Sequence, residues 1–346
     1  MTLPAHPALS ADFSRWGFGQ AFRSVYLDGF LVSIGVHELL QRADSIEALL
    51  RSAAPDQVGI LYYVLSTVRR GRMIAGYGAD RLGPGKHFLD VGCGFGGSLV
   101  GAHELGATVH GIEIDSTRLA AARALMMDNG ISAKLEACDI FTSCFELFPH
   151  MDLVVSENVI EHVDDPRRFM ETMFAKLVDG GALILEIPNG RALRSVTSDP
   201  HYNLPSITLL SHESARRLFE VVLGRDQYGL AYSVGDYFPA AWYREALGAR
   251  SARITRQHRA DALYSLADLP DALTKLDAAL ERAKTLYDKL PALLREEVFH
   301  KARCYIDGVR AAHASLLEAD ADQSAEFDAF EETYLSAAWI MRFDRA

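Results

Sequence analysis

Short apolar strands alternate with helices from residue 86 to about residue 245, and no other feature of this chain limits its fold as much. Strands are expected at 87–92, 108–115, 133–140, 151–158 and 182–189, with helices at 98–106, 116–130 and 165–181 between them. Ser116 and Gly130 are expected to begin and end the second of these helices. Strands joined by helices of this length form βαβ units, so the pattern predicts an α/β fold with a parallel sheet covered on both faces.

Two helical regions flank the alternating segment. Apolar residues at helical spacing predict helices at 32–54 and 58–78, and two amphipathic helices packed as a hairpin at 269–290 and 292–320. A Pro/Gly cluster at 82–85 interrupts the pattern, and no strand is expected after residue 246. The expected organisation is a helical lid region at 1–84, a ligand-binding core at 85–245 and a second helical region at 246–346.

The composition excludes several classes of partner. The 346 residues include 35 Lys and Arg against 46 Asp and Glu, a net charge of −11, whereas nucleic-acid-binding proteins neutralise phosphates with basic residues. No apolar run approaches the roughly 20 residues that span a bilayer, and residues 1–16 lack a secretory pattern. We therefore expect a cytoplasmic protein without nucleic-acid or membrane partners. The four cysteines lack CxxC and zinc-site spacing and are expected to be free thiols: Cys93, Cys138, Cys144 and Cys304.

A glycine-rich loop follows the first expected strand. Residues 92–97 hold four glycines just after Asp90, and glycine lets the backbone turn tightly while a ligand approaches without a Cβ in the way. Gly92, Gly94 and Gly97 also satisfy GxGxxG, the dinucleotide pattern. Asp90 would repel a pyrophosphate, however, so the loop favours a ligand with an ammonium or sulfonium group.

Two further acids follow the next strands. Glu113 is placed to accept hydrogen bonds from a ribose diol, and Asp139 from the exocyclic amine of an adenine. An ammonium group, a ribose and an adenine in succession along one sheet edge describe S-adenosylmethionine. The alternative roles are a solvated strand end for Glu113 and a helix cap for Asp139.

Five sequence segments resemble, in order and spacing, the motifs of class I S-adenosylmethionine-dependent methyltransferases of the small-molecule branch: DVGCGFGG, GIEID, ACDI, DLVVSENVIEHVDDP and GGALILEIPN. The resemblance covers about residues 86–190. It implies a doubly wound, mostly parallel, seven-stranded Rossmann-like sheet with an antiparallel last hairpin, expected to begin at 228–238. It also implies a set of cofactor-binding residues, namely Asp90, Gly92, Cys93, Gly94, Gly96, Glu113, Ile114, Cys138, Asp139, Ile140, Glu157 and Asn158.

A Glu–His pair, Glu161 and His162, lies one turn beyond the fourth strand. Ubiquinone-pathway O-methyltransferases, which the sequence resembles here, use such a pair together with a preceding acid to bind a divalent metal. Asn158 occupies the position of that acid and Glu157 is displaced by one, so no metal is expected. His162 is the candidate general base, with a structural role as the alternative.

Residues 189–219 form an insert after the fifth strand. In the methyltransferases that this sequence resembles, the segment at this place usually lies over the substrate pocket. This insert contains four candidate substrate-binding residues, with an ordinary solvated loop as the alternative: Arg191, Arg194, His201 and Tyr202. A basic cluster at 244–259 is either a solvated linker or a means of attracting an anionic substrate.

The resemblance predicts an enzyme that transfers the methyl group of S-adenosylmethionine to an oxygen or nitrogen of a small molecule or sugar-bearing metabolite. One alternative is a cofactor-binding module of the same fold that acts through a protein partner without catalysis. Another is a nicotinamide dehydrogenase, which Asp90 disfavours. The helical regions are expected to cover the crevice, with Trp16, Phe18, Tyr62 or Tyr237 near the acceptor, and extra core or a homodimer contact is their alternative role.

Overall fold

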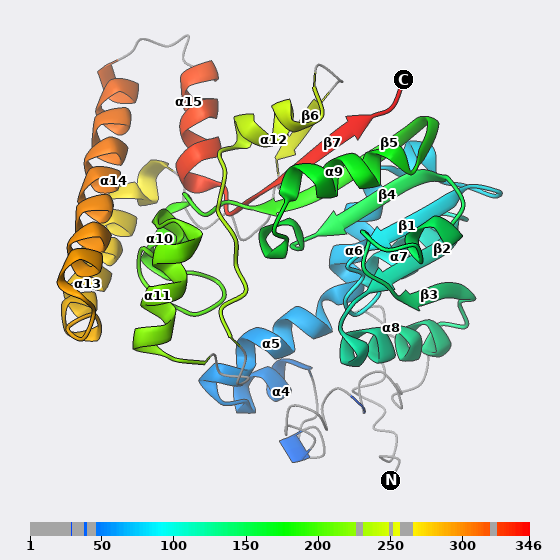
Figure 1. Ribbon diagram of the computed structural model, residues 1–346, viewed down its shortest axis with the longest axis horizontal. Coiled ribbons are helices and arrows are strands. Elements are labelled where there is room, and N and C mark those ends of the chain that lie inside the picture. Colours follow the sequence, from blue (N-terminus) through cyan, green and yellow to red (C-terminus); the bar gives the residue numbers. More distant parts are fainter. Residues whose placement is uncertain are drawn as a thin grey trace. The chain divides into compact units, whose positions relative to one another are not determined.

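The computed structural model describes residues 46–225, 231–248, 252–256, 266–318 and 324–346, together with 29, 38 and 39. Its strands are β1 (His87–Val91), β2 (Thr108–Glu113), β3 (Ala133–Ala137), β4 (Met151–Glu157), β5 (Leu177–Pro188), β6 (Ala252–Arg256) and β7 (Ala338–Asp344). They lie in one sheet in the order β3-β2-β1-β4-β5-β7-β6 (Figure 1). The helices are α4 (Ile46–Ser52), α5 (Pro55–Leu65), α6 (Thr67–Gly76), α7 (Gly97–Glu104), α8 (Ser116–Asp128), α9 (Pro166–Ala175), α10 (Leu193–Thr197), α11 (His212–Val222), α12 (Ala240–Ala246), α13 (Leu269–Leu286), α14 (Ala292–Glu318) and α15 (Ser324–Phe330).

The sheet is mostly parallel, which confirms the predicted α/β fold. β1 pairs in parallel with β2 and β4, and β2 with β3. β7 runs antiparallel to β5. The Gly180 N–H, near the start of β5, donates to the Arg345 carbonyl just after β7, whereas the Asn189 N–H, just after β5, donates to the Ala337 carbonyl just before β7. Two sequence-based expectations about strands were wrong. Residues 231–238 form no strand, with 228–230 outside the described residues, and strands do occur after residue 246.

The chain divides into two compact units. Unit 1 comprises Met1–Glu157, Arg168–Leu185 and Arg342–Ala346, and unit 2 comprises Asn158–Arg167 and Glu186–Met341. Unit 1 thus contains β1 to β4 with α5 to α8, and unit 2 contains α10 to α15. No helix in the described parts of either unit has both the length and the apolar character needed to cross a membrane.

Glycines bring α6 and α7 of unit 1 into backbone contact. A Cβ placed on Gly71 would overlap the backbone of Gly97, and one on Gly97 would overlap that of Thr67. Only glycine permits such an approach. The single helix expected at 58–78 is in fact divided at Ser66 into α5 and α6. The contact fixes the start of α6 against the end of the glycine loop.

The N-cap of helix α8 lies one residue earlier than expected. The N-cap is Asp115 rather than Ser116, and its carboxylate accepts the backbone N–H groups of Thr117 and Arg118 at 2.8 and 3.1 Å. An ionised carboxylate also interacts favourably with the positive end of the helix dipole. Gly130, with φ of 64°, follows the helix end as predicted.

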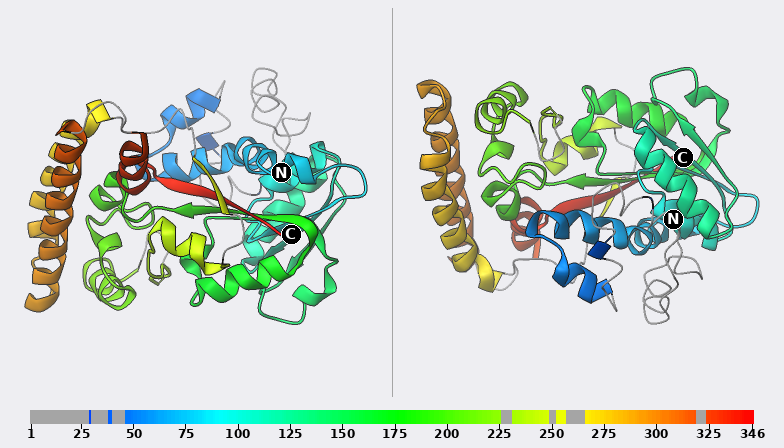
Figure 2. Two further views of the ribbon diagram at one scale, coloured as in Figure 1. Left: turned by 90° about the horizontal axis from the view of Figure 1, so that it is seen from above. Right: turned by 90° about the horizontal axis from the view of Figure 1, so that it is seen from below.

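In unit 2 the predicted helical hairpin is confirmed. Helices α13 and α14 lie side by side in Figures 1 and 2, and Arg310 of α14 donates to Asp277 of α13 at 3.4 Å. Their apolar faces share one core with α10, which includes Leu276, Ile306 and Leu193. The three- and four-residue spacing of the apolar residues produces these buried faces.

Candidate functional site

The glycine loop joins β1 to α7 in unit 1 and turns back onto β2. The N–H groups of Gly92 and Cys93 both donate to the Ile112 carbonyl at 2.9 Å. Gly92, Gly94 and Gly96 have φ values of 76°, 49° and 82°, which side chains other than glycine rarely adopt. The loop conformation itself therefore requires these three glycines.

Glu113, at the end of β2, holds the glycine loop in place. Its side chain is buried, with Oε2 accepting the Gly94 N–H and Oε1 the Asp115 N–H, each at 2.9 Å. A carboxylate oxygen has a second lone pair, so Glu113 can still accept hydrogen bonds from a ribose diol. The sequence pattern predicted the ribose contact and missed the attachment to the loop.

Asp90, in β1, is a buried acid with unused hydrogen-bonding capacity. Its Oδ2 accepts from the Ser98 hydroxyl, whereas Oδ1 has no hydrogen-bond partner among the described residues. Burial, with a smaller contribution from the charge of Glu113, raises the pKa of Asp90 to about 7. A cationic ligand would supply the missing partner and favour the ionised form.

A small cavity of about 30 Å³ adjoins the glycine loop within unit 1. Its lining residues come from α5, α6, β1, the loop, α7 and the end of β4: Tyr63, Thr67, Arg70, Asp90, Gly92, Cys93, Gly94, Phe95, Gly97, Ser98 and Glu157. The sequence pointed to Tyr62, whereas its neighbour Tyr63 lines the cavity. Of the other aromatic candidates, Trp16 and Phe18 lie outside the described residues, and Tyr237 packs against the core around Phe219 in unit 2.

Arg70 places a cation in the same cavity as Asp90. Its guanidinium donates to the Tyr63 carbonyl at 2.6 Å and lies 3.9 Å from the centroid of the Tyr63 ring. No carboxylate of the described residues pairs with it. Sequence reasoning missed both residues, although the glycine at position 71 was a signal that this helix approaches another backbone closely.

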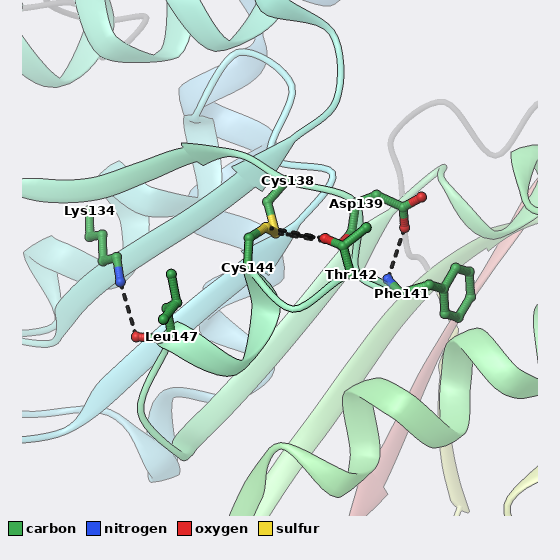
Figure 3. Close-up of a disulfide and its surroundings, with 7 residues drawn as sticks. All are labelled: Lys134, Cys138, Asp139, Phe141, Thr142, Cys144 and Leu147. Carbon is green, nitrogen blue, oxygen red and sulfur yellow. Dashed lines mark hydrogen bonds between the residues drawn. A yellow bond between two sulfur atoms is a disulfide. The ribbon is translucent and has the colours of Figure 1, made fainter.

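The next residues along the sheet edge are those predicted to border an adenine. Glu113 pairs with Ala137 across β2 and β3, so Ile114 and Cys138 follow at the same edge. Ile114 is 77 % exposed, which leaves an apolar surface available to a ring. Asp139 accepts the Phe141 N–H at 2.9 Å through Oδ1 (Figure 3), which closes a turn, whereas the alternative expected for it was a helix cap.

Two of the four cysteines are not free thiols, contrary to the sequence-based expectation. Cys138 is joined to Cys144 by a disulfide that closes the loop after β3 (Figure 3). The two cysteines are six positions apart in the sequence, a spacing that is neither CxxC nor that of a zinc site. Cys93, which is buried, and Cys304, which is exposed, are free.

A second polar cluster lies in unit 2, in the residues that follow β4. Glu161 and His162 belong to the short 3-10 helix Ile160–His162, and His201 comes from the insert after β5. Glu161 Oε1 is 3.8 Å from His162 Nε2 and 3.9 Å from His201 Nε2. The structure thus joins the predicted general base to one of the four predicted substrate-binding residues and to an acid.

Burial favours the neutral forms of Glu161 and His201. It raises the pKa of Glu161 to about 8, with a smaller contribution from the charge of Glu186. It also lowers the pKa of His201 to about 4, with His162 contributing to the shift. The backbone at His201 is fixed by Asp199, whose carboxylate accepts the N–H groups of His201, Tyr202 and Leu204.

The remaining predicted residues are placed as follows. Asn158 has φ of 53°, uncommon for a residue other than glycine, and its N–H donates to the Glu186 carbonyl at 3.1 Å. Arg191 and Arg194 are exposed, whereas Tyr202 packs in the core around Phe219. Of the basic cluster at 244–259, Arg244 forms an ion pair with Glu332, and the other side chains lie outside the described residues.

Two solved structures that the chain resembles have low TM-scores. A mycolic acid cyclopropane synthase complexed with SAH and CTAB has a TM-score of 0.40 at 17 % identity, covering 80 % of this chain and 82 % of that one. A SAM-bound amino pentose methyltransferase from Micromonospora echinaspora has a TM-score of 0.31 at 27 % identity, covering 35 % and 50 %.

Comparison of sequences identifies the family. A ubiquinone biosynthesis O-methyltransferase of Pseudomonas savastanoi is 33 % identical over 112 residues, which are 32 % of this chain and 48 % of that protein. One of Pseudomonas fluorescens (strain SBW25) is 30 % identical over 105 residues, 30 % and 45 %. The chain thus spans about half the length of the curated relatives it matches. The family model described as "Methyltransferase domain" matches residues 69–281. Because that match covers more than half of the chain, this protein belongs to the methyltransferase domain family, and the predicted membership of the class I S-adenosylmethionine-dependent methyltransferases is confirmed.

Proposed function

We propose that this protein transfers the methyl group of S-adenosylmethionine to an oxygen or nitrogen of a small molecule. The observation that carries the proposal is the cavity in unit 1, which contains one buried acid and one cation, Asp90 and Arg70. These groups match the ammonium and the carboxylate at the amino-acid end of the cofactor. Glu113 would then accept the ribose hydroxyls, and Ile114 and Asp139 would border the adenine.

Helices α5 and α6 are proposed to cover the amino-acid end of the cofactor. Tyr63 and Arg70, which line the cavity, come from these helices rather than from the core between 85 and 245. Covering this end excludes water from the reacting atoms. This supports the lid role proposed for the N-terminal helical region over the alternative role as a dimer contact.

We assign removal of the proton from the methyl acceptor to the cluster of Glu161, His162 and His201. The Nδ1–H of His162 donates to the Ser233 carbonyl at 2.9 Å, so its Nε2 carries the lone pair that a base requires. The names of the curated relatives, which are O-methyltransferases, favour a hydroxyl oxygen as the acceptor atom. Arg191 and Arg194 are exposed candidates for binding an anionic substrate.

The experiment compares thermal stabilisation by S-adenosylhomocysteine and by NAD, followed by a screen of metabolites for methylated products by mass spectrometry. Saturating S-adenosylhomocysteine should stabilise the protein by about 2–4 kcal/mol, and NAD should have no effect. Stabilisation by NAD alone would refute the proposal. Stabilisation by S-adenosylhomocysteine without methylation of any compound in a broad library would favour the alternative, a binding module without catalysis.

A further inference from the structure

We propose that the Cys138–Cys144 disulfide controls the affinity of this protein for its cofactor, so that thiol reductants weaken binding. The bridge closes the loop that follows β3 (Figure 3). Two of the residues that it encloses, Asp139 and Ile140, are among those expected to border the adenine. The link to the cofactor rests on the proposed function, whereas the effect of the bridge on the loop can be tested without a ligand.

The bridge begins at the edge of the sheet where the cofactor is proposed to bind. Ala137, the last residue of β3, pairs with Glu113, the last residue of β2, so Cys138 and Ile114 follow them at the same edge. β3 is the first strand in the sheet order and pairs with β2 alone among the described strands. Because an edge strand has a neighbour on one side only, the placement of the segment after it depends on what else holds that segment.

The other end of the bridge is fixed within unit 1. Cys144 directly precedes the short 3-10 helix Phe145–Leu147, in which Phe145 is buried. The Lys134 ammonium group donates to the Leu147 carbonyl at 3.0 Å and so ties this helix back to β3 (Figure 3). Through the disulfide, this anchored helix holds Cys138 and the start of the loop in place.

The other contacts of the loop are short-range or few. Asp139 Oδ1 accepts the Phe141 N–H at 2.9 Å, and the Asp139 carbonyl accepts the N–H and the hydroxyl of Thr142 at 3.0 and 2.7 Å. Asp139 and Thr142 are exposed, so water competes for these hydrogen bonds. Ile140 is buried, and the Phe141 ring centroid lies 4.6 Å from the Arg168 guanidinium of α9. Breaking the disulfide should therefore leave the turn formed but its placement at the sheet edge less fixed.

A loop that is already in place favours cofactor binding. A ligand that must order a mobile loop loses affinity by the conformational entropy of that ordering, and a covalent bridge removes much of this cost. The protein with the disulfide intact should therefore bind the adenine end of the cofactor more tightly than the reduced protein.

The exposure of the two cysteines determines how the bridge is reduced. Cys138 is only 4 % exposed, whereas Cys144 is partly exposed and follows the exposed Ser143. A thiolate of a dithiol reductant therefore attacks the Cys144 sulfur, the S–S bond breaks, and Cys138 leaves as a thiolate that takes up a proton. The second thiol of the reductant then releases Cys144, so the protein gains two electrons and two protons and the reductant becomes a disulfide. Hydrogen peroxide reverses the change, since it oxidises both thiols to the disulfide and is itself reduced to two molecules of water.

The test compares the full-length protein before and after reduction by dithiothreitol. Thiol titration of the unfolded chain should find two thiols before reduction, from Cys93 and Cys304, and all four cysteines after it. Amide hydrogen exchange at residues 139–143 should become faster on reduction in the absence of any ligand. Calorimetry should give a dissociation constant for S-adenosylhomocysteine that is about threefold to tenfold higher in the reduced protein.

Two matched variants separate the bridge from other effects of the reductant. Cys144→Ser removes the bridge and should bind S-adenosylhomocysteine as weakly as the reduced wild type, with or without dithiothreitol. Cys304→Ser removes an exposed free thiol on α14, keeps the bridge and should retain the full response to reduction.

The outcomes distinguish this proposal from the proposed function. Four thiols before reduction would overturn the control by the disulfide, and so would equal, measurable affinities of the oxidised and reduced proteins. Binding of S-adenosylhomocysteine in neither state would refute the proposed function itself, because the bridge would then have no cofactor to control.

Discussion

Replacing Glu113 by alanine should affect both stability and cofactor binding, because the structure gives this carboxylate two tasks. It accepts the N–H groups of Gly94 and Asp115 within a buried setting. Hydrogen bonds to a charged group contribute about 1.5–3 kcal/mol each, so Glu113→Ala should lower the free energy of unfolding by about 3 kcal/mol or more. At about 2 °C per kcal/mol for a chain of this size, the melting temperature should fall by roughly 6 °C.

The effect on the cofactor is separable from the effect on stability. Loss of the ribose contacts, together with a loosened glycine loop, should weaken S-adenosylhomocysteine binding by about one to two orders of magnitude. Calorimetry measures the affinity and differential scanning fluorimetry the melting temperature. Glu136→Ala, which removes an exposed acid from the adjacent strand β3, is the matched control and should change neither.

Two outcomes would refute parts of this reasoning. A lower melting temperature with unchanged affinity would leave the attachment to the loop standing but remove the ribose assignment. Unchanged values of both quantities would mean that the hydrogen bonds from the Gly94 and Asp115 N–H groups to the Glu113 carboxylate contribute nothing to stability. The loop conformation would then depend on its glycines alone. Glu113→Gln, which keeps one acceptor oxygen, should lie between wild type and Glu113→Ala.

Three further predictions concern the cavity and the helices beside it. Gly71→Ala should lower the free energy of unfolding, measured by chemical denaturation, by about 1–3 kcal/mol because the added Cβ overlaps α7. Gly76→Ala in the same helix has open space around it and should not lower this free energy. Arg70→Ala should raise the dissociation constant for S-adenosylhomocysteine by about tenfold, and Arg69→Ala should not, as calorimetry would show. Because the pKa of Asp90 is raised to about 7, the folded apoprotein holds a proton there that an ammonium ligand displaces, so affinity should fall up to about tenfold per pH unit below 7. A pH-independent affinity between pH 5 and 7 would contradict this linkage, and Asp90→Asn should abolish the pH dependence.

Much of the fold and half of the candidate site could be predicted because the signals are local. The alternation of apolar strands and helices follows from side-chain periodicity, and it located β1 to β4, the later part of β5 and the α13–α14 hairpin. The conformation of the loop demands glycine at particular positions, and parallel strands bring their carboxyl ends to one edge, so Asp90 and Glu113 could be assigned from the sequence alone.

Tertiary structure alone decided the features that depend on residues far apart in the chain. β7 pairs with β5 across some 150 residues, and neither strand carries a local mark of that pairing. Arg70 reaches the cavity because glycines let α6 touch α7, and His201 meets Glu161 because Asp199 fixes the insert that carries it. Periodicity describes which face of an element is buried, but not which distant element covers it, since that choice depends on how the shapes of both surfaces fit together.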